Sequence, residues 1–255
     1  MGNTQKQRIV VVGNGMVGHR CVEELCDRLD SASVEITLFC AEPRLAYDRV
    51  HLSSYFSHHT SEELSLVKPG FYERHGIRVL IGEAVKQIDR AAKVVHSNKG
   101  TEIEYDTLIL ATGSYPWVPP IQGSQHHECF VYRTIEDLKA IRAAAKQGKS
   151  GVVIGGGLLG LEAAGALKAL GLQTHVVEVA PVLMAEQLDR LGGELLRRKI
   201  ESMGVQVHTS KQTKEIQMHG GKSALHRLEF ADGSELEVDV VVFSTGVRPQ
   251  DTLGR

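Results

Sequence analysis

The stretch VVIGGGLLGLE, at positions 152–162, constrains the fold of this chain more than any other feature. Three apolar residues are followed by Gly155, Gly157 and Gly160 in the spacing G-x-G-x-x-G, and then by a helix-like run to Leu170. The first glycine of such a stretch permits a tight turn, the second lets a pyrophosphate approach the backbone, and the third lets the helix pack closely on the strand. Free N–H groups at the helix N-terminus attract the phosphates. The stretch predicts a dinucleotide-binding unit; the alternative is a glycine-rich turn in another kind of α/β protein.

A carboxylate follows the next apolar strand of this unit. The strand is predicted at Thr174–Val177, and Glu178 comes directly after it, about 20 residues beyond the glycines, where an acidic side chain accepts hydrogen bonds from an adenosine ribose. Because a carboxylate repels the 2′-phosphate of NADPH, Glu178 predicts a preference for NADH. Strand, glycines, helix, strand and acid in this order are much more specific than the glycines alone.

The same arrangement occurs near the start of the chain, in the stretch RIVVVGNGMVG at 8–18. An apolar strand is again followed by three glycines in the same spacing, Gly13, Gly15 and Gly18, and then by a predicted helix. The acid arrives later than in the other copy, at Glu42. We take Glu42 as the candidate ribose ligand of this unit; the alternative is an exposed loop carboxylate.

The two halves of the chain share one layout. Each has a glycine unit, short strands that predict a β-meander, and an apolar strand that ends in Thr-Gly, at Thr112-Gly113 and at Thr245-Gly246. This repeat predicts an α/β protein with two Rossmann-like dinucleotide-binding domains of the three-layer ββα type, each with a small β-meander. The proline-rich stretch Ser114–Gly123, which holds the only tryptophan, is the predicted linker. The expected domains are 1–122, 123–244, and a return into the first domain at 245–255.

Composition and charge argue against several classes of partner. The formal net charge is −2, with 42% hydrophobic and 24% charged residues, so neither a nucleic acid nor an anionic membrane is expected as a partner. No apolar run has transmembrane length and the N-terminus has no signal-peptide core, so a cytoplasmic location is expected. The four scattered cysteines and the histidine pairs His58-His59 and His126-His127 lack metal-ligand spacing, so no metal site is predicted and both pairs are expected at the surface.

The stretch Ala46–Phe56 mixes aromatic, basic and hydroxyl residues directly after the first glycine unit. Arg49 is suited to pair with a pyrophosphate, because a guanidinium forms paired hydrogen bonds to phosphate oxygens. The alternative is a surface loop with a capped helix. A short capped helix is also predicted just beyond, at Ser61–Leu66.

Together these segments resemble a known superfamily, the flavoprotein reductases with two dinucleotide-binding domains. It includes glutathione-reductase-like enzymes, ferredoxin and rubredoxin reductases, and apoptosis-inducing factor. The resemblance is closer still to the N-terminal part of the large subunits of assimilatory NAD(P)H nitrite reductases. The segments that carry it are VVGNGMVGHR, EPRLAYDRVHLSSYFSHH, ATGSYPWVPPI, VYRTIEDL, VVIGGGLLGLEAAGALK and PVLMAEQLDRLGGELLRRKIESMGVQVHTS.

The resemblance implies that the first unit holds FAD and the second holds NADH. The FAD contacts that it implies are Gly13, Gly15, Met16, Gly18, Glu42, Arg49, Val85, Ala111, Thr112, Gly113 and Arg133. The NADH contacts that it implies are Gly155, Gly157, Leu158, Leu159, Gly160, Glu178 and Gly246. Glu162 is expected near the nicotinamide in an orienting role; the alternative is a structural helix carboxylate. Related ferredoxin reductases carry a lysine after their Leu-Ser pair, whereas this chain has Ser54 there.

The resemblance also frames the expected chemistry. Disulfide reductases of the superfamily need a cysteine pair beside the flavin, and its NADH oxidases need one cysteine there. The loop from Tyr47 to Tyr55 has none. Direct hydride transfer from nicotinamide C4 to flavin N5 is therefore expected, with no side chain acting as acid or base.

Two segments of the related proteins have no counterpart in this sequence. One is a later Gly-Asp segment that holds the flavin's ribityl chain, so the FAD domain is expected to be incomplete at its C-terminus. The other comprises iron–sulfur and sirohaem regions, so a fragment is expected that passes electrons to those centres in the missing remainder, which reduce nitrite to ammonium. Further expected partners are a small subunit and, as an option, a second copy of the chain. The alternatives are a stand-alone ferredoxin or rubredoxin reductase, and a non-catalytic flavoprotein of the apoptosis-inducing-factor kind.

Overall fold

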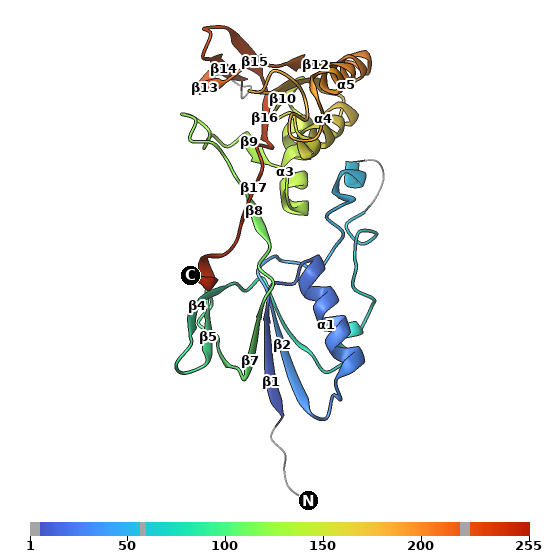
Figure 1. Ribbon diagram of the computed structural model, residues 1–255, viewed down its shortest axis with the longest axis vertical. Coiled ribbons are helices and arrows are strands. Elements are labelled where there is room, and N and C mark those ends of the chain that lie inside the picture. The colour runs from blue at the N-terminus through green and yellow to red at the C-terminus, as the bar shows by residue number, and fades with distance from the viewer. Residues whose placement is uncertain (1–5, 57–59, 220–224) are drawn as a thin grey trace, which may run out of the picture. The chain divides into compact units, whose positions relative to one another are not determined.

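The computed structural model describes residues 6–56, 60–219 and 225–255, which form two compact units (Figure 1). Unit 1 comprises the chain up to Val50, Ser61–Ser114 and Pro249–Arg255, and unit 2 comprises His51–Thr60 and Tyr115–Arg248. The first boundary lies at 114 and not at 122, the second lies at 248 and not at 244, and residues 51–60 belong to unit 2. Which nucleotide each unit binds stays a prediction. His58-His59 lie outside the described residues.

Unit 1 is built on a parallel four-stranded sheet in the order β3-β2-β1-β7. Its strands and helices are β1 (Gln7–Val12), α1 (Met16–Arg28), β2 (Val34–Cys40), α2 (Phe71–Arg74), β3 (Arg78–Ile81) and β7 (Thr107–Leu110). An antiparallel meander of β4 (Val85–Asp89), β5 (Val94–Ser97) and β6 (Glu102–Glu104) completes it.

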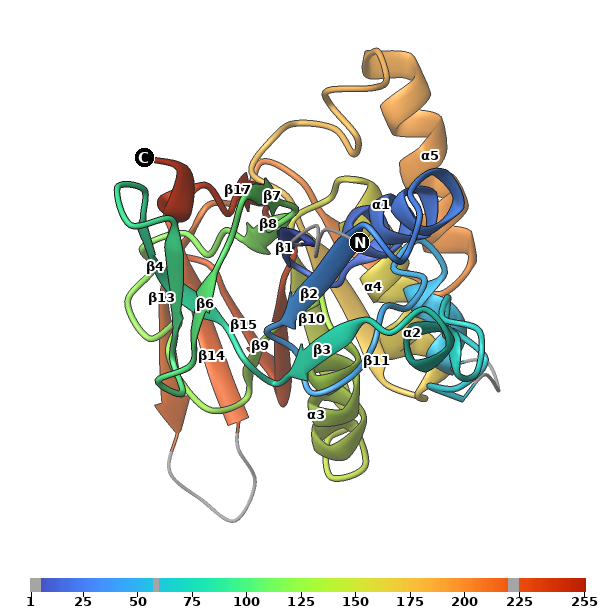
Figure 2. The ribbon, with the colours of Figure 1, turned by 90° about the horizontal axis from the view of Figure 1, so that it is seen from below.

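The residues of β1 alternate between two cores, as the two-residue period of a strand requires. Ile9 and Val11 pack in the core that includes Val22 of α1, whereas Val10 and Val12 pack in the core that includes Val95 of the meander. The sheet is thus covered by helix on one face and by the meander on the other (Figure 2). This is the three-layer ββα arrangement predicted from the sequence.

Unit 2 repeats the plan with a parallel five-stranded sheet in the order β12-β11-β10-β16-β9. Its elements are β9 (Cys129–Val131), α3 (Ile135–Ala145), β10 (Ser150–Ile154), α4 (Leu158–Ala169), β11 (Gln173–Val177), α5 (Arg190–Ser202), β12 (Val205–His208), β13 (Thr213–His219), β14 (Leu225–Phe230), β15 (Glu235–Val238) and β16 (Val240–Phe243). Val152 and Ile154 of β10 pack with Leu228 and Phe230 of the β13–β15 meander, so the meander covers one face of this sheet as well.

The segment after Val50 joins unit 2 because its aromatic side chains dock there. It forms a 3₁₀ helix, η1 (Leu52–Phe56), in the stretch where the sequence offered a loop with a capped helix as the alternative to a cofactor-binding segment. The guanidinium of Arg142 lies 4.4 Å from the ring centroid of Tyr55 and donates to the Tyr55 carbonyl oxygen, and Phe56 stacks on Tyr132 with centroids 6.5 Å apart. These contacts join segments far apart in the sequence.

Two further features differ from the sequence-based expectation. The predicted linker contains a short strand, β8 (Ser114–Pro116), which pairs with β17 (Val247–Pro249). The helix predicted at Ser61–Leu66 is wrong, because the segment forms turns and makes its backbone hydrogen bonds with residues 46–48 instead.

A 3₁₀ turn, η2 (Thr252–Gly254), lies near the C-terminal residue. In the ranges that the structure describes, no helix has both the length and the apolar character needed to cross a bilayer.

Candidate dinucleotide sites

The glycine turn of unit 2 has a separate steric reason for each of its three glycines. Gly155 has a φ of +117°, and a Cβ added there would lie 2.3 Å from the carbonyl oxygen of Ser244. A Cβ on Gly160 would lie 1.9 Å from the carbonyl oxygen of Gly155, whereas a Cβ on Gly157 would meet nothing within 4 Å. The turn and packing roles predicted for the first and third glycines are therefore confirmed. The open space over the second fits a cradle for a pyrophosphate.

Unit 1 has the same three reasons in the same order. Gly13 has a φ of +112°, and its added Cβ would lie 2.2 Å from the carbonyl oxygen of Ala111. A Cβ on Gly18 would lie 1.8 Å from the carbonyl oxygen of Gly13, and a Cβ on Gly15 would meet nothing within 4 Å. Helix α1 begins directly after this open glycine, at Met16, so its free N–H groups lie at the open side. The residues present fit a dinucleotide in both units.

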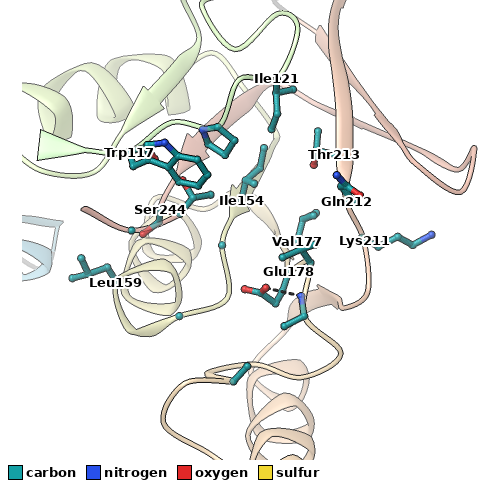
Figure 3. Close-up of a pocket in the computed structure, with 18 of the residues that line it drawn as sticks. Trp117, Ile121, Ile154, Leu159, Val177, Glu178, Lys211, Gln212, Thr213 and Ser244 are labelled. Carbon is teal, nitrogen blue, oxygen red and sulfur yellow. Dashed lines mark hydrogen bonds between the residues drawn. The ribbon is translucent and has the colours of Figure 1, made fainter. Parts of the chain in front are cut away.

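A cavity of about 920 Å³ opens at the carboxyl ends of β10, β11 and β16 in unit 2 (Figure 3). Binding pockets for cofactors range over roughly 300–1,000 Å³, and in parallel sheets they lie at this edge. The predicted NADH residues that line it are Gly155, Gly157, Leu158, Leu159, Glu178 and Gly246. Gly160 lies one turn further along α4, where it packs against the glycine turn instead.

Glu178 is fixed by two backbone donors. One carboxylate oxygen accepts a hydrogen bond from the N–H of Gly156 at 2.6 Å, and the other accepts one from the N–H of Ala180 at 2.8 Å. The side chain is half-buried on the cavity wall, while the neighbouring Val179 is 66% exposed. A carboxylate held in this way keeps lone pairs for further donors, since each ionised carboxylate has about four acceptor sites.

The two lysines that line this cavity are both paired with carboxylates. Lys211 pairs with Asp232 and donates to the hydroxyl of Ser234 at 2.6 Å, and Lys214 pairs with Glu229 at 2.9 Å. Lys211 holds the pKa of Asp232 below its usual range. The positive charges on this wall are thus paired with carboxylates of the same unit.

Glu162, predicted near the nicotinamide, does not line the cavity. It lies half-buried on α4, close enough to Tyr132 that its charge, after burial, contributes to raising the pKa of that phenol. Tyr132 is itself buried, and its hydroxyl has no hydrogen-bond partner within the described part of the chain.

In unit 1 the predicted FAD residues Glu42 and Arg49 are brought together. They form a half-buried ion pair, and the hydroxyl of Tyr47 donates to the second Glu42 oxygen at 2.8 Å. The Arg49 guanidinium also lies 4.8 Å from the ring centroid of Tyr47. Glu42, the counterpart of Glu178 in unit 1, is therefore charge-compensated by Arg49 of the same loop.

The remaining predicted FAD residues are spread over several elements. Val85 is buried in the meander core, and Ala111 extends the ladder of β7 by donating to Val12 at 2.8 Å. Thr112 and Gly113 hydrogen-bond the backbone of Gln250, with Gly113 at a φ of +69°. Arg133 belongs to unit 2.

A buried polar network behind the unit 1 glycine turn was missed by the sequence analysis. The hydroxyl of Tyr72 donates to the side-chain oxygen of Asn14 at 2.9 Å and meets Nδ1 of His19 at 2.9 Å, while Nε2 of His19 lies 3.2 Å from the carbonyl oxygen of Leu66. All three side chains are at most 7% exposed. The only signal in the sequence was a polar residue between the first two glycines.

The described residues contain no group of three or more side chains suited to hold a metal ion. His127 is exposed as predicted, but His126 is half-buried, with its ring 6.1 Å from that of the fully buried His226. All four cysteines are free thiols: Cys21, Cys26, Cys40 and Cys129.

Comparison with known proteins agrees with the geometry. Residues 7–255 match the family described as pyridine nucleotide-disulphide oxidoreductase. The chain is 66% identical over 97% of its length to a protein named nitrite reductase (NADH) large subunit from Escherichia coli, and 53% identical over 98% to nitrite reductase [NAD(P)H] large subunit from Klebsiella oxytoca. It spans 29% and 26% of those relatives.

Among solved structures, a ferredoxin reductase from Rhodopseudomonas palustris superposes with a TM-score of 0.88 at 26% identity, over 98% of this chain and 61% of that one. The match to the family covers both glycine turns, both sheets and both meanders. Proteins of this family bind FAD and NAD(P)H. The chain belongs to the pyridine nucleotide-disulphide oxidoreductase family.

Proposed function

We propose that this chain is the electron-input module of an NADH-dependent nitrite reductase. It binds FAD in unit 1 and NADH in unit 2, and electrons leave the flavin for iron–sulfur and sirohaem centres elsewhere in the full protein, where nitrite is reduced to ammonium. The observation that carries the proposal is the repeated turn, in which each unit has two glycines locked by sterics and one left open. The 66% identity to part of a relative named NADH nitrite reductase supports the choice of reaction.

The residues of unit 2 supply binding and orientation. Glu178 accepts from the adenosine ribose, the open backbone at Gly157 and the start of α4 hold the pyrophosphate, and Leu158 and Leu159 pack against the dinucleotide. Gly246 closes the other end of the cavity, and Glu162 orients the nicotinamide. Of these, all but Glu162 line the cavity.

The residues of unit 1 would hold FAD in the corresponding way. Its proposed binding set is Gly13, Gly15, Met16, Gly18, Glu42, Arg49, Val85, Ala111, Thr112 and Gly113; Arg133 is a contact implied by the resemblance alone. Bound there, FAD would supply the hydride acceptor for NADH and the onward electron transfer, and these residues would hold and orient it.

Cysteine chemistry is not part of this proposal. Burial raises the pKa of the Cys40 thiol to about 11 and that of Cys129 to about 12, which disfavours the nucleophilic thiolate. No cysteine lines the unit 2 cavity or lies between Tyr47 and Tyr55. Direct hydride transfer therefore fits the chain better than a disulfide mechanism.

NADH is the proposed donor in preference to NADPH. A 2′-phosphate would enter beside the Glu178 carboxylate, and both lysines on the cavity wall are already paired. The cost of placing two anions together without a free cation disfavours NADPH.

A second candidate is a stand-alone ferredoxin or rubredoxin reductase in the cytoplasm. The fold match to a ferredoxin reductase supports it. Against it, Ser54 occupies the position of the lysine found in that group. Reduction of an added ferredoxin at rates close to those with ferricyanide would favour this candidate over the nitrite reductase module.

The visible spectrum of the purified chain, before and after anaerobic addition of NADH, tests the proposal. Flavin absorption that bleaches with NADH is the expected result. A colourless chain that still binds NADH would retain the assignment of unit 2 and overturn that of unit 1. A chain that binds neither cofactor would overturn both, and would equally exclude both candidate functions.

A further inference from the structure

Trp117, the only tryptophan of the chain, lies on the wall of the unit 2 cavity (Figure 3). Its backbone is tied on both sides to the segment that follows β16. Its N–H donates to the carbonyl oxygen of Gly246 at 2.9 Å, and its carbonyl oxygen accepts from the hydroxyl of Thr245 at 2.5 Å. The guanidinium of Arg248 lies 5.3 Å from its ring centroid. The ring is thus held in place, yet the residue stays 36% exposed.

The strand order locates Trp117 along the cavity. The neighbouring strands β11, β10 and β16 place Glu178, the Gly155–Gly157 turn and Thr245-Gly246 in that order along one edge of the sheet. Neighbouring strands lie about 4.8 Å apart, so the ends of β11 and β16 are roughly 10 Å apart. Trp117 is therefore at the opposite end from Glu178, as Figure 3 also shows.

We infer that Trp117 contacts the nicotinamide half of the bound dinucleotide and positions it. The inference rests on the proposed function of unit 2. With the adenosine ribose at Glu178 and the pyrophosphate over Gly157, the other half of an extended dinucleotide passes the end of β16. An aromatic ring fixed there offers a flat π surface to a planar heterocycle. The contact favours the oxidised, cationic nicotinamide in particular, since a tryptophan face attracts positive charge.

The binding test compares two ligands that share one half. NADH carries both halves, whereas ADP-ribose lacks the nicotinamide ring. In Trp117→Ala the dissociation constant for NADH should rise about three- to tenfold, the size of a lost aromatic contact, while that for ADP-ribose changes less than twofold. Trp117→Phe should recover most of the NADH affinity. Tyr115→Ala is the matched control, because Tyr115 is 47% exposed in the same segment but does not line the cavity.

Each other outcome counts against the inference. Unchanged NADH affinity in Trp117→Ala would overturn it while the proposed function stands. An equal loss for NADH and ADP-ribose would also overturn it, because it would show a general distortion of the cavity. Absence of NADH binding by the unsubstituted chain would instead overturn the proposed function, and the inference with it.

The emission of the single tryptophan gives an independent test in the unsubstituted chain. NAD⁺ should quench Trp117 emission, because the nicotinamide ring stacks on it, and ADP-ribose at saturation should leave the emission nearly unchanged. Equal quenching by the two ligands would place the adenosine half at Trp117 and overturn the assignment of the two ends.

Discussion

The two units share the same glycine turn, but different side chains hold it in place. In each glycine turn the residue between the first two glycines makes a hydrogen bond that holds the turn. In unit 2 the N–H of Gly156 donates to Glu178, whose carboxylate also lies on the cavity wall. In unit 1 the middle residue is Asn14, and its side chain is held from behind by Tyr72 and, through it, by His19. In unit 2 one carboxylate thus holds the turn and is also the proposed ribose ligand, whereas in unit 1 the turn is held by Asn14 and the proposed ligand is Glu42.

The glycines of the two turns thus have the same steric surroundings, whereas the side chains that hold the turns by hydrogen bonds differ between the units. The steric distances at the three glycines agree within a few tenths of an ångström in the two turns. The supporting side chains share neither type nor location. Substitutions at the glycines should therefore affect both units alike, and substitutions at the supports should affect one unit and one cofactor only.

The largest expected effect is at the third glycine of each turn. In Gly160→Ala and Gly18→Ala the new methyl group would lie within 2 Å of a backbone carbonyl oxygen, which has no flexible side chain to move aside. Each substitution should lower the free energy of unfolding of its unit by about 3 kcal/mol, at the upper end of overpacking effects. Denaturant unfolding followed by circular dichroism measures this loss.

The open glycines provide the matched controls. Gly157→Ala and Gly15→Ala add a methyl group that meets nothing within 4 Å, so the free energy of unfolding should change by less than about 1 kcal/mol. Cofactor affinity should fall nonetheless, because the methyl group occupies the path of the pyrophosphate. A Gly157→Ala variant as unstable as Gly160→Ala would refute the division of roles among the glycines.

Substitution of Glu178 has the next largest expected effect. Glu178→Ala removes both the hydrogen bond to the turn and the proposed ribose contact, and hydrogen bonds to a charged group contribute about 1.5–3 kcal/mol each. The Michaelis constant for NADH should rise about 10- to 100-fold, with a much smaller change in turnover. Steady-state kinetics with ferricyanide as acceptor measure both.

The comparison with unit 1 sharpens this experiment. Glu42→Gln should weaken FAD binding less than Glu178→Ala weakens NADH binding, because Arg49 remains beside the site and Asn14 still holds the turn. Glu178→Gln should also narrow the preference for NADH over NADPH, since the negative charge is lost. Unaltered NADH affinity in Glu178→Ala would remove the ribose assignment.

The elements fixed by local patterns were predictable, and those fixed by distant partners were not. The strand predicted at Thr174–Val177 is found at Gln173–Val177, because a short apolar run beside turn residues defines it locally. The pairing of β8 with β17 joins residues more than 130 positions apart, and the docking of Tyr55 depends on Arg142. No local pattern encodes either contact.

The residues of the candidate site also fall into those predictable from local spacing and those placed by contacts with distant segments. The glycines and Glu178 follow from spacing, so they were identified before the fold was known. Trp117 was assigned to a linker because its prolines mark an irregular segment, and only the hydrogen bonds to Thr245 and Gly246 bring it to the cavity. Asn14 was passed over because its partner Tyr72 lies far along the chain.

A smaller effect, confined to unit 1, is expected from Tyr72→Phe. The variant keeps the buried ring but removes the hydroxyl that joins Asn14 to His19, and a net hydrogen bond contributes about 1 kcal/mol. Burial raises the pKa of Tyr72, so the hydroxyl stays protonated and able to donate. FAD affinity should fall a few-fold while NADH affinity stays constant. An equal loss of both affinities would contradict the separate supports of the two turns.

The last expected effect is an acid sensitivity of unit 2 that comes from its buried histidines and involves no cofactor. Burial, and then the neighbouring His208, lowers the pKa of His175 to about 4, and burial also lowers the pKa values of His208 and His226. The groups that face His208 include Lys211 and Arg197, which add to the lowering.

Because the unfolded chain takes up these protons near pH 6.5 and the folded chain does not, stability is full above about pH 6.5 and declines as the pH falls toward 4. The decline is at most about 1.4 kcal/mol per pH unit for each histidine. His175→Gln should lessen the drop in melting temperature between about pH 7 and pH 5, whereas the exposed His127→Gln should leave it unchanged. A melting temperature that rises on acidification would contradict the sign. A decline that His175→Gln leaves untouched would assign the acid sensitivity to His208 or His226 instead.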